Sequence, residues 1–396
     1  MKSIVDIENK NKVAIVTVGY NRLSSLQRLL ESLLQGDYHS CSNVPLVICI
    51  DSSGNEILYS YVNEFQWPFG DKYVIIQEKR LGLKEHIFKC AGLTKYFKGI
   101  ILLEDDLFVA RNFYNYANQA IDYYYDEPKV ASISLYNEEM NGFCWLPFDR
   151  LHGDSDAYAV KAVFSWGECW TERMWNDFLE WNSKTDIQWE SVDMPPQIST
   201  WTKAWSKYFH AYMAENDLYS IVPYVSLTTN FSDAGEHGES NNTIVQVNLQ
   251  YGHKDYEFKP FSELVRYDAF SNNILVAEHL QMTEKELLLD LYGTRENNLN
   301  KRFWITTRCL PYKVVKSFGL FLRPQELNVL YDIPGNGIFL YDTTEVDRKP
   351  TVTSFSNRML YYLHGFNFRY MPAACWGYFI SLSRKAIQKL SKNFGL

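Results

Sequence analysis

The chain has 396 residues, which is enough for two or three domains and for a substantial buried core. Its formal charge of −8 is uneven, with −17 over residues 1–300 and +9 over residues 301–396. These features exclude a nucleic acid as the main partner, because the basic part has no dense run of Lys and Arg and the acidic part would repel a polyanion. The basic part favours a membrane surface or a phosphate-bearing substrate.

The seven cysteines form no CxxC pair, a pattern that is typical of reduced thiols rather than of a disulfide framework. The N-terminal segment MKSIVDIENKNK has no apolar signal core. No run of about 18 apolar residues predicts a transmembrane helix. We therefore expect a cytoplasmic protein, with at most a peripheral contact to the inner face of the membrane.

The first 135 residues alternate apolar runs with segments of helical spacing. Strands are predicted at residues 13–18, 45–50, 73–76, 100–103 and 130–135, and helices at residues 21–35, 83–97 and 112–125. Asn112 is expected to cap the last of these helices. Apolar strands separated by helices indicate an α/β fold with a mostly parallel sheet and helices on both faces.

Polar clusters follow three of the predicted strands, at Thr17–Arg22, Asp51–Gly54 and Glu104–Asp106. The carboxyl ends of parallel strands share one edge of a sheet, and ligands of such folds bind there. We expect the three clusters to meet at a common site.

Residues 136–250 are rich in Trp and are expected to pack beside the sheet as a second half. Residues 251–396 are expected to form a C-terminal basic, aromatic extension. In this extension, a capping box of Thr283 and Glu286 predicts a helix over residues 283–292. Residues 378–390 predict an amphipathic helix with Arg384, Lys385 and Lys389 near one side.

The triplet Glu104-Asp105-Asp106 directly follows an apolar strand. Adjacent carboxylates repel one another unless a cation or several hydrogen-bond donors neutralise them. Mn²⁺ or Mg²⁺ prefers such oxygens together with those of phosphates. The triplet therefore predicts a divalent-metal site, and the alternative is a solvated acidic turn.

The segment ILLEDDLFVARNFY, residues 101–114, resembles the metal-binding strand end of N-acetylglucosaminyltransferase I and of related, family 2-like bacterial polysaccharide glycosyltransferases. The resemblance covers residues 12–240 and implies a GT-A nucleotide-diphospho-sugar transferase fold. It implies a nucleotide-sugar-binding half at residues 1–135 and an acceptor-binding half at residues 136–250. Asp106 would bind the metal, while Glu104 and Asp105 would orient the donor.

The resemblance implies further donor contacts, each with a structural alternative. Most lie at strand ends or in the first turns that follow them. Asp51 would hydrogen-bond the uracil or cap a helix, and His86 would contact the base or be structural. The loop 230–238 would close over the donor or be an ordinary surface loop. The implied donor-binding residues are Thr17, Asn21, Arg22, Asp51, His86, Ser165, Trp166, Gly167 and His237.

The catalytic base is not where the family has it. An inverting transferase needs a carboxylate that takes the proton of the acceptor hydroxyl. The family carries an Asp after a Trp, whereas this chain has Thr202 after Trp201. Asp193 is the preferred substitute. Other nearby acids are Asp154, Asp156, Glu190, Glu215 and Asp217.

These patterns predict transfer of a sugar from a UDP-sugar to an oligosaccharide or lipid-linked glycan in bacterial capsule, O-antigen or exopolysaccharide synthesis. A bacterial source is expected because a eukaryotic Golgi enzyme would need an anchor helix. Two alternatives stay open. A nucleotidyltransferase would usually carry a Gly-rich phosphate loop, and none follows Val18. A non-catalytic sugar-binding or assembly protein on a degenerate GT-A domain would explain Thr202.

Overall fold

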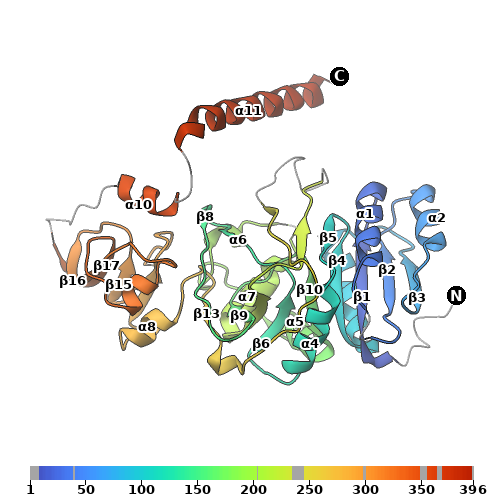
Figure 1. Ribbon diagram of the computed structural model, residues 1–396, viewed down its shortest axis with the longest axis horizontal. Helices are drawn as coiled ribbons and strands as arrows, with labels where there is room; N and C mark the ends of the chain where they lie inside the picture. The colour runs from blue at the N-terminus through green and yellow to red at the C-terminus, as the bar shows by residue number, and fades with distance from the viewer. Residues whose placement is uncertain are drawn as a thin grey trace. The chain divides into compact units, whose positions relative to one another are not determined.

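The computed structural model describes residues 9–38, 41–202, 204–233, 245–297, 300–347, 355–363 and 368–394 (Figure 1). The chain divides into two units, Met1–Pro350 and Thr351–Leu396. The division into segments 1–135, 136–250 and 251–396 stays a prediction.

The first unit is built on a nine-stranded sheet in the order β13-β9-β11-β6-β10-β4-β1-β2-β3. Five of its neighbouring pairs are parallel, and β10 lies antiparallel between β4 and β6. The strands are β1 Asn9–Gly19, β2 Leu46–Ile50, β3 Lys72–Ile76, β4 Phe97–Glu104, β6 Val130–Ser134, β9 Ala157–Val160, β10 Glu168–Thr171, β11 Tyr219–Pro223 and β13 Arg266–Tyr267.

The central strands are buried on both faces, because residues that point to opposite faces are equally inaccessible. Ile100, Ile101 and Leu103 in β4 are each 0% exposed. The covering helices are α1 Leu23–Leu34, α2 Glu56–Glu64, α3 Leu83–Ala91, α4 Phe113–Tyr123, α5 Glu172–Lys184 and α7 Ser206–Asn216, with the 3-10 turn η2 Gly92–Tyr96. This arrangement confirms the predicted α/β class with a mostly parallel, doubly covered sheet.

The predicted strands and helices of the first 135 residues all form, with shifted ends. The helix α2 was not predicted; the Asn55 side chain caps it by accepting from the amide of Leu58 at 3.1 Å. Asn112 precedes α4, but the prediction that its side chain caps this helix is wrong. Its amide instead donates to the carbonyl of Lys254 at 2.8 Å and holds that distant segment in place.

The prediction that residues 136–250 pack beside the sheet is also wrong, because three strands of this segment belong to it. Trp170 in β10 explains part of the aromatic content. Its ring packs against Trp175 of α5 at 5.1 Å and Trp205 at 5.5 Å between ring centroids. Many of the Trp residues are therefore core.

A second sheet follows, with the order β14-β15-β17-β16. Its strands are β14 Leu287–Asp290, β15 Phe303–Thr306, β16 Tyr312–Phe318 and β17 Ile338–Val346. The helix predicted at residues 283–292 is wrong. The amide and the hydroxyl of Thr283 both donate to the Glu286 carboxylate, at 3.1 and 2.7 Å, but in a turn, and only the first of these is a capping-box bond. The Leu287–Asp290 run then pairs with β15, because all four residues are buried there.

The remaining short elements connect these layers. They are β5 Leu107–Val109, β7 Met140–Asn141, β8 Leu146–Pro147, α6 Pro196–Ser199, β12 Thr228–Asn230, η4 Phe261–Glu263, α8 Leu275–His279 and α9 Leu327–Leu330. Cys49, Cys90 and Cys169 are buried free thiols, as expected for these three.

The second unit contains α10 Phe355–Tyr362, the 3-10 turn η5 Phe368–Tyr370 and α11 Met371–Phe394. The helix predicted at residues 378–390 lies within α11 and is confirmed. Among the described residues, no helix combines the length and the apolar character that crossing a bilayer requires.

Ile101 tests the burial of β4. Ile101→Ala should lower the free energy of unfolding by about 2–5 kcal/mol, because a cavity opens in the centre of the sheet. The matched control is Ile57→Ala in α2, where the side chain is 72% exposed. That change should cost less than about 0.5 kcal/mol. Equal effects of the two changes in urea titrations would contradict the burial.

Candidate functional site

The acid triplet lies where the sequence predicts it, at the carboxyl end of the buried strand β4. Glu104 is the last residue of β4, and Asp105 and Asp106 form the turn into β5. The neighbouring strand β1 pairs Val18 with Glu104. The chain that leaves β1 therefore passes directly beside the triplet.

Arg22 is the residue that this geometry brings to the triplet. Its guanidinium Nη2 forms ion pairs with Asp105 Oδ1 and, at 3.1 Å, with Asp106 Oδ2. Its Nε donates to Asp105 Oδ2 at 3.3 Å. Burial disfavours the charge of Arg22, but the two carboxylates outweigh it and raise the pKa of the guanidinium. One arginine thus neutralises part of a three-acid cluster.

Glu104 and Asp105 still hold their protons more tightly than ordinary carboxyl groups. Burial and then the charges of Asp106 and Asp105 raise the pKa of Glu104 to about 8, although Arg22 and a hydrogen bond with Trp205 act against this. Burial likewise raises the pKa of Asp105 to about 6, against the effect of Arg22. Arg22 therefore does not fully neutralise the cluster, and a further positive charge would stabilise its ionised form.

Asp106 offers a vacant acceptor. Its Oδ1 is buried and has no hydrogen-bond partner among the residues that the structure describes. In the same part of the chain, no three His, Cys, Asp or Glu side chains are arranged as a complete metal-ligand set. Mg²⁺ commonly binds through one or two carboxylates plus phosphate oxygens. The residues present therefore fit a cation that a phosphate ligand would help to hold.

An open cleft of about 510 Å³ has Arg22 in its wall, and through this residue it is linked to Asp105 and Asp106, which do not line it. The first turn of α1 forms most of the lining. This turn contains no acidic residue, and no described side chain caps it. Unpaired backbone amides at a helix N-terminus bind anions. The cleft residues are Asn21, Arg22, Leu23, Ser24, Ser25, Gln27 and Asp233.

The segment after β12 closes one side of this cleft. The amide of Phe231 donates to the carbonyl of Asp106 at 2.9 Å. Asp233 pairs with Arg28 of α1, whose guanidinium lies 3.9 Å from the centre of the Phe231 ring. The start of the predicted loop 230–238 is thus attached to both α1 and the triplet. His237 lies outside the described residues.

The other predicted contacts at this edge are more enclosed. Asp51 is 3% exposed and accepts hydrogen bonds from the amides of Leu81 and Gly82 at 2.8 and 2.9 Å. It does not cap α2. Burial lowers the pKa of His86, which lies near Asp51 and is 2% exposed. Thr17 is fully buried, and its Oγ1 has no partner among the described residues.

Residues 165–167 lead into β10. The carbonyl of Trp166 accepts a hydrogen bond from Thr228, and its ring packs on Tyr136 with 4.6 Å between centroids. Gly167 has φ +110°, and a Cβ there would lie 3.0 Å from Thr228 Cγ2. Only glycine fits this position without strain. Ser165 lies half-buried in the same turn.

Glu168 is a buried acid that sequence reasoning missed. It is 1% exposed, and its carboxylate accepts a hydrogen bond from the amide of Phe164 at 2.9 Å. Its Oε2 is buried without a partner in the described part of the chain. Burial raises its pKa to about 8, against the effect of the hydrogen bond from the Phe164 amide. An acid between Gly167 and the apolar CWT of β10 was the available signal.

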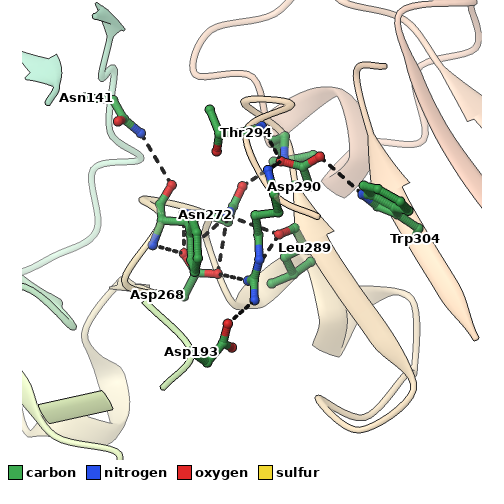
Figure 2. Close-up of polar contacts among 11 residues, drawn as sticks. Asn141, Asp193, Asp268, Asn272, Leu289, Asp290, Thr294 and Trp304 are labelled. Atoms are coloured by element: carbon green, nitrogen blue, oxygen red, sulfur yellow. Dashed lines mark hydrogen bonds and ion pairs between the residues drawn. The ribbon is translucent and has the colours of Figure 1, made fainter. Parts of the chain in front are cut away.

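Asp193, the predicted base, lies in a different network, which Figure 2 shows. It forms an ion pair with Arg295, whose side chain is 5% exposed. Arg295 also binds Asp268 at 3.1 Å and lies over the Phe270 ring at 4.0 Å. This network joins the Asp193 loop to the segment that leads out of β14.

The alternative acids have their own environments. Lys254 binds Asp156 at 2.6 Å, and the amide of Glu257 donates to the same carboxylate at 2.9 Å. Asp154 and Thr202 are exposed. The structure thus brings Asn21, Arg22 and the triplet together and places Asp193 with Arg295. Whether these residues bind a donor or act in catalysis stays a prediction.

No known protein family matches the chain, and neither does any curated protein sequence. Solved structures of TarS from S. aureus with UDP-GlcNAc and of a mannosyltransferase from Pyrobaculum calidifontis with GDP-Man and Mn²⁺ do match. The first has 16% identity and TM-score 0.36, and the match covers 57% of this chain and 60% of the TarS chain. The second has 12% identity and TM-score 0.33, and the match covers 56% of this chain and 60% of the mannosyltransferase chain.

GalNAc-T7 with UDP, GalNAc and Mn²⁺ matches at 16% identity and TM-score 0.36, over 55% of this chain and 43% of its own. The chain spans about three fifths of the matched TarS chain. The Pyrobaculum calidifontis protein is a mannosyltransferase by name. The resemblance to N-acetylglucosaminyltransferase I in particular stays a prediction.

Glu168 gives a test of the site's electrostatics. Its pKa is raised from 4.5 to about 8, so between these pH values the folded protein keeps a proton that the unfolded chain releases. Stability must therefore fall as pH rises through this range. Glu168→Gln should remove that loss and gain on the order of 1–3 kcal/mol over wild type between about pH 5 and pH 8.

Urea titrations at several pH values measure this difference. Glu64→Gln, at an exposed position in α2, is the control and should follow the wild-type pH profile. A Glu168→Gln profile that stays parallel to wild type would show that Glu168 ionises normally.

Proposed function

We propose that the protein is a glycosyltransferase that moves a sugar from a UDP-sugar to a carbohydrate acceptor with the help of Mn²⁺ or Mg²⁺. The observation that supports this most is the acid triplet at the end of β4. There, the Asp106 Oδ1 is buried and has no partner among the described residues, and Asp106 pairs with Arg22, which lines a cleft at the first turn of α1.

The donor diphosphate would lie between Asp106 and the first turn of α1. The unpaired amides of this turn and the Arg22 guanidinium would bind its phosphate oxygens. Asp106 would hold the cation, which supplies charge to stabilise the leaving nucleotide diphosphate. Arg22 already links Asp105 to Asp106, so the same group positions the acids and faces the cleft.

The residues around the cleft also favour exclusion of water. The segment from Phe231 to Asp233 is attached to Asp106 and Arg28 on one side of the cleft. A loop that continues from this attachment would cover a bound donor and protect it from hydrolysis. His237 would belong to that cover.

The acceptor is proposed to be an oligosaccharide or lipid-linked glycan of a bacterial surface polysaccharide, reached from the cytoplasmic side. The sequence motivates this through its basic, aromatic C-terminal part. No nucleic acid is expected as a partner, because the first unit is strongly acidic.

A non-catalytic sugar-binding protein is the second candidate. The observation in its favour is Thr202, which is exposed where the resembling family has its catalytic Asp. A nucleotidyltransferase is less favoured, because the turn after β1 is Gly-Tyr-Asn-Arg rather than a Gly-rich phosphate loop. UDP release from a UDP-sugar with acceptor lysate distinguishes an enzyme from both.

Asp106→Asn tests the metal role. With Mn²⁺ present, the variant should release UDP about 10²–10³-fold more slowly than wild type, because the cation loses its anionic ligand. Chelation of the metal should slow wild type to a similar rate. The control Asp126→Asn, at an exposed position after α4, should keep the wild-type rate. Equal rates for Asp106→Asn and wild type would contradict the proposal.

Asp193→Asn tests the predicted base. A general base contributes about 10²–10⁴-fold, so kcat should fall by that factor while UDP-sugar affinity is kept. Arg295→Met serves as the companion, because it removes the ion pair and leaves the Asp193 carboxylate. If Asp193 serves only that ion pair, both variants will lose thermal stability and keep kcat, and the base must be sought elsewhere.

A further inference from the structure

The start of the C-terminal helix carries an unusual density of exposed apolar side chains. Of the 21 large hydrophobic residues that are exposed in the described part of the chain, seven lie within 13 consecutive positions. Trp376 and Phe379 are 69% and 61% exposed. Exposed apolar residues are ordinary when scattered, but a dense group marks an interaction surface. The seven are Tyr370, Met371, Trp376, Tyr378, Phe379, Ile380 and Leu382.

Helical spacing sorts the sequence of α11 into two sides. The helix spans 24 residues. At about 3.6 residues per turn, positions three and four apart share a side. One side carries Trp376, Phe379, Ile380, Ser383, Ile387, Leu390 and Phe394. The other side has Ser381, Arg384, Lys385, Gln388, Lys389 and Lys392 by the same spacing. In the sequence, the apolar spacing thus runs from Trp376 to Phe394.

The charge of the unit is of one sign. Residues 351–396 contain six Lys and Arg and no Asp or Glu. Two copies of α11 that paired through their apolar sides would bring like charges together with no acid to compensate them. A partner with an apolar layer beneath an anionic layer complements both the apolar side of α11 and the positive charge of the unit. A bilayer surface with acidic lipids has that composition.

The helix does not suit a membrane-spanning position. Its second half, from Arg384 to Lys392, would expose Arg, Lys and Gln to hydrocarbon. Helices with a basic polar side, and with Trp, Phe and Leu opposite, lie in the plane of the interface instead. Aromatic residues such as Trp376 and Tyr378 favour the headgroup level, where one end of the ring stays hydrated.

We propose that α11 is an in-plane anchor on anionic membranes, with Trp376, Phe379 and Ile380 inserted below the headgroups. The basic side of the helix then faces the lipid phosphates. This anchor is separate from the cleft at β4, and it does not depend on sugar transfer. It assigns specific inserted residues to the part of the chain whose sequence predicts an amphipathic helix and a peripheral membrane contact.

Vesicle co-sedimentation of the full-length protein tests this anchor. Binding to phosphatidylcholine vesicles that contain phosphatidylglycerol should be at least about tenfold stronger than binding to phosphatidylcholine alone. High salt should weaken it, since surface charges are screened. The double variant Phe379→Ser/Ile380→Ser should bind at least about tenfold more weakly, because it removes two inserted apolar groups.

Tyr251→Ser is the matched control, because Tyr251 is 87% exposed and lies outside α11. It should bind within about threefold of wild type. Unchanged thermal melting of each variant shows that the main unit remains folded.

Four results would overturn the anchor. The double variant could bind like wild type, or the protein could ignore anionic vesicles altogether. Alternatively, wild type could sediment as a dimer that the double variant dissociates while vesicle binding stays the same, which would make this surface a contact between copies. Release of bound protein by an equal phosphate concentration of soluble glycerol phosphate would likewise count against insertion.

Discussion

The repulsion among three adjacent carboxyl groups at the end of β4 is the constraint on which the rest of the site depends. A strand buried on both faces forces Glu104 and Asp105 out of water, and burial raises the pKa of both. Arg22 relieves part of this by pairing with Asp105 and Asp106. A structural turn would be more stable with fewer acids here. Three carboxyl groups with one arginine are therefore best explained by a site that binds a cation.

The fold supplies the other parts of the site through strand order. Because β1 lies next to β4, the first turn of α1 and Arg22 reach the triplet. Because β12 pairs with β5, the segment from Phe231 to Asp233 lies against Asp106 and α1. Two segments far apart in sequence thus line one cleft, and both contact the turn that contains the triplet. This arrangement connects an anion-binding helix end to an acidic site, which a diphosphate and a divalent cation would satisfy together.

The sequence predicts what is local and apolar. The first strands are continuous apolar runs, so their type and the meeting of the polar clusters followed from periodicity and topology. The short strand β10 was not predicted, because it has only four residues with polar Glu168 and Thr171 at its ends, and because its place between β4 and β6 depends on distant pairing. Distant pairing also explains the wrong helix prediction at residues 283–292. The capping-box pattern of Thr283 and Glu286 is local, whereas the pairing of Leu287–Asp290 with β15 is not. The Asp193–Arg295 ion pair joins residues 102 positions apart, beyond any local signal.

The central claim is that Asp106 and a donor diphosphate hold one cation between them. Electron paramagnetic resonance titration of Mn²⁺ into the protein, with and without UDP, measures free and bound metal directly. The account predicts that UDP strengthens Mn²⁺ binding at least about tenfold, because each ligand supplies oxygens that the other needs, and that Asp106→Asn abolishes this coupling. Mn²⁺ binding that is indifferent to UDP, or coupling that survives in Asp106→Asn, would contradict it.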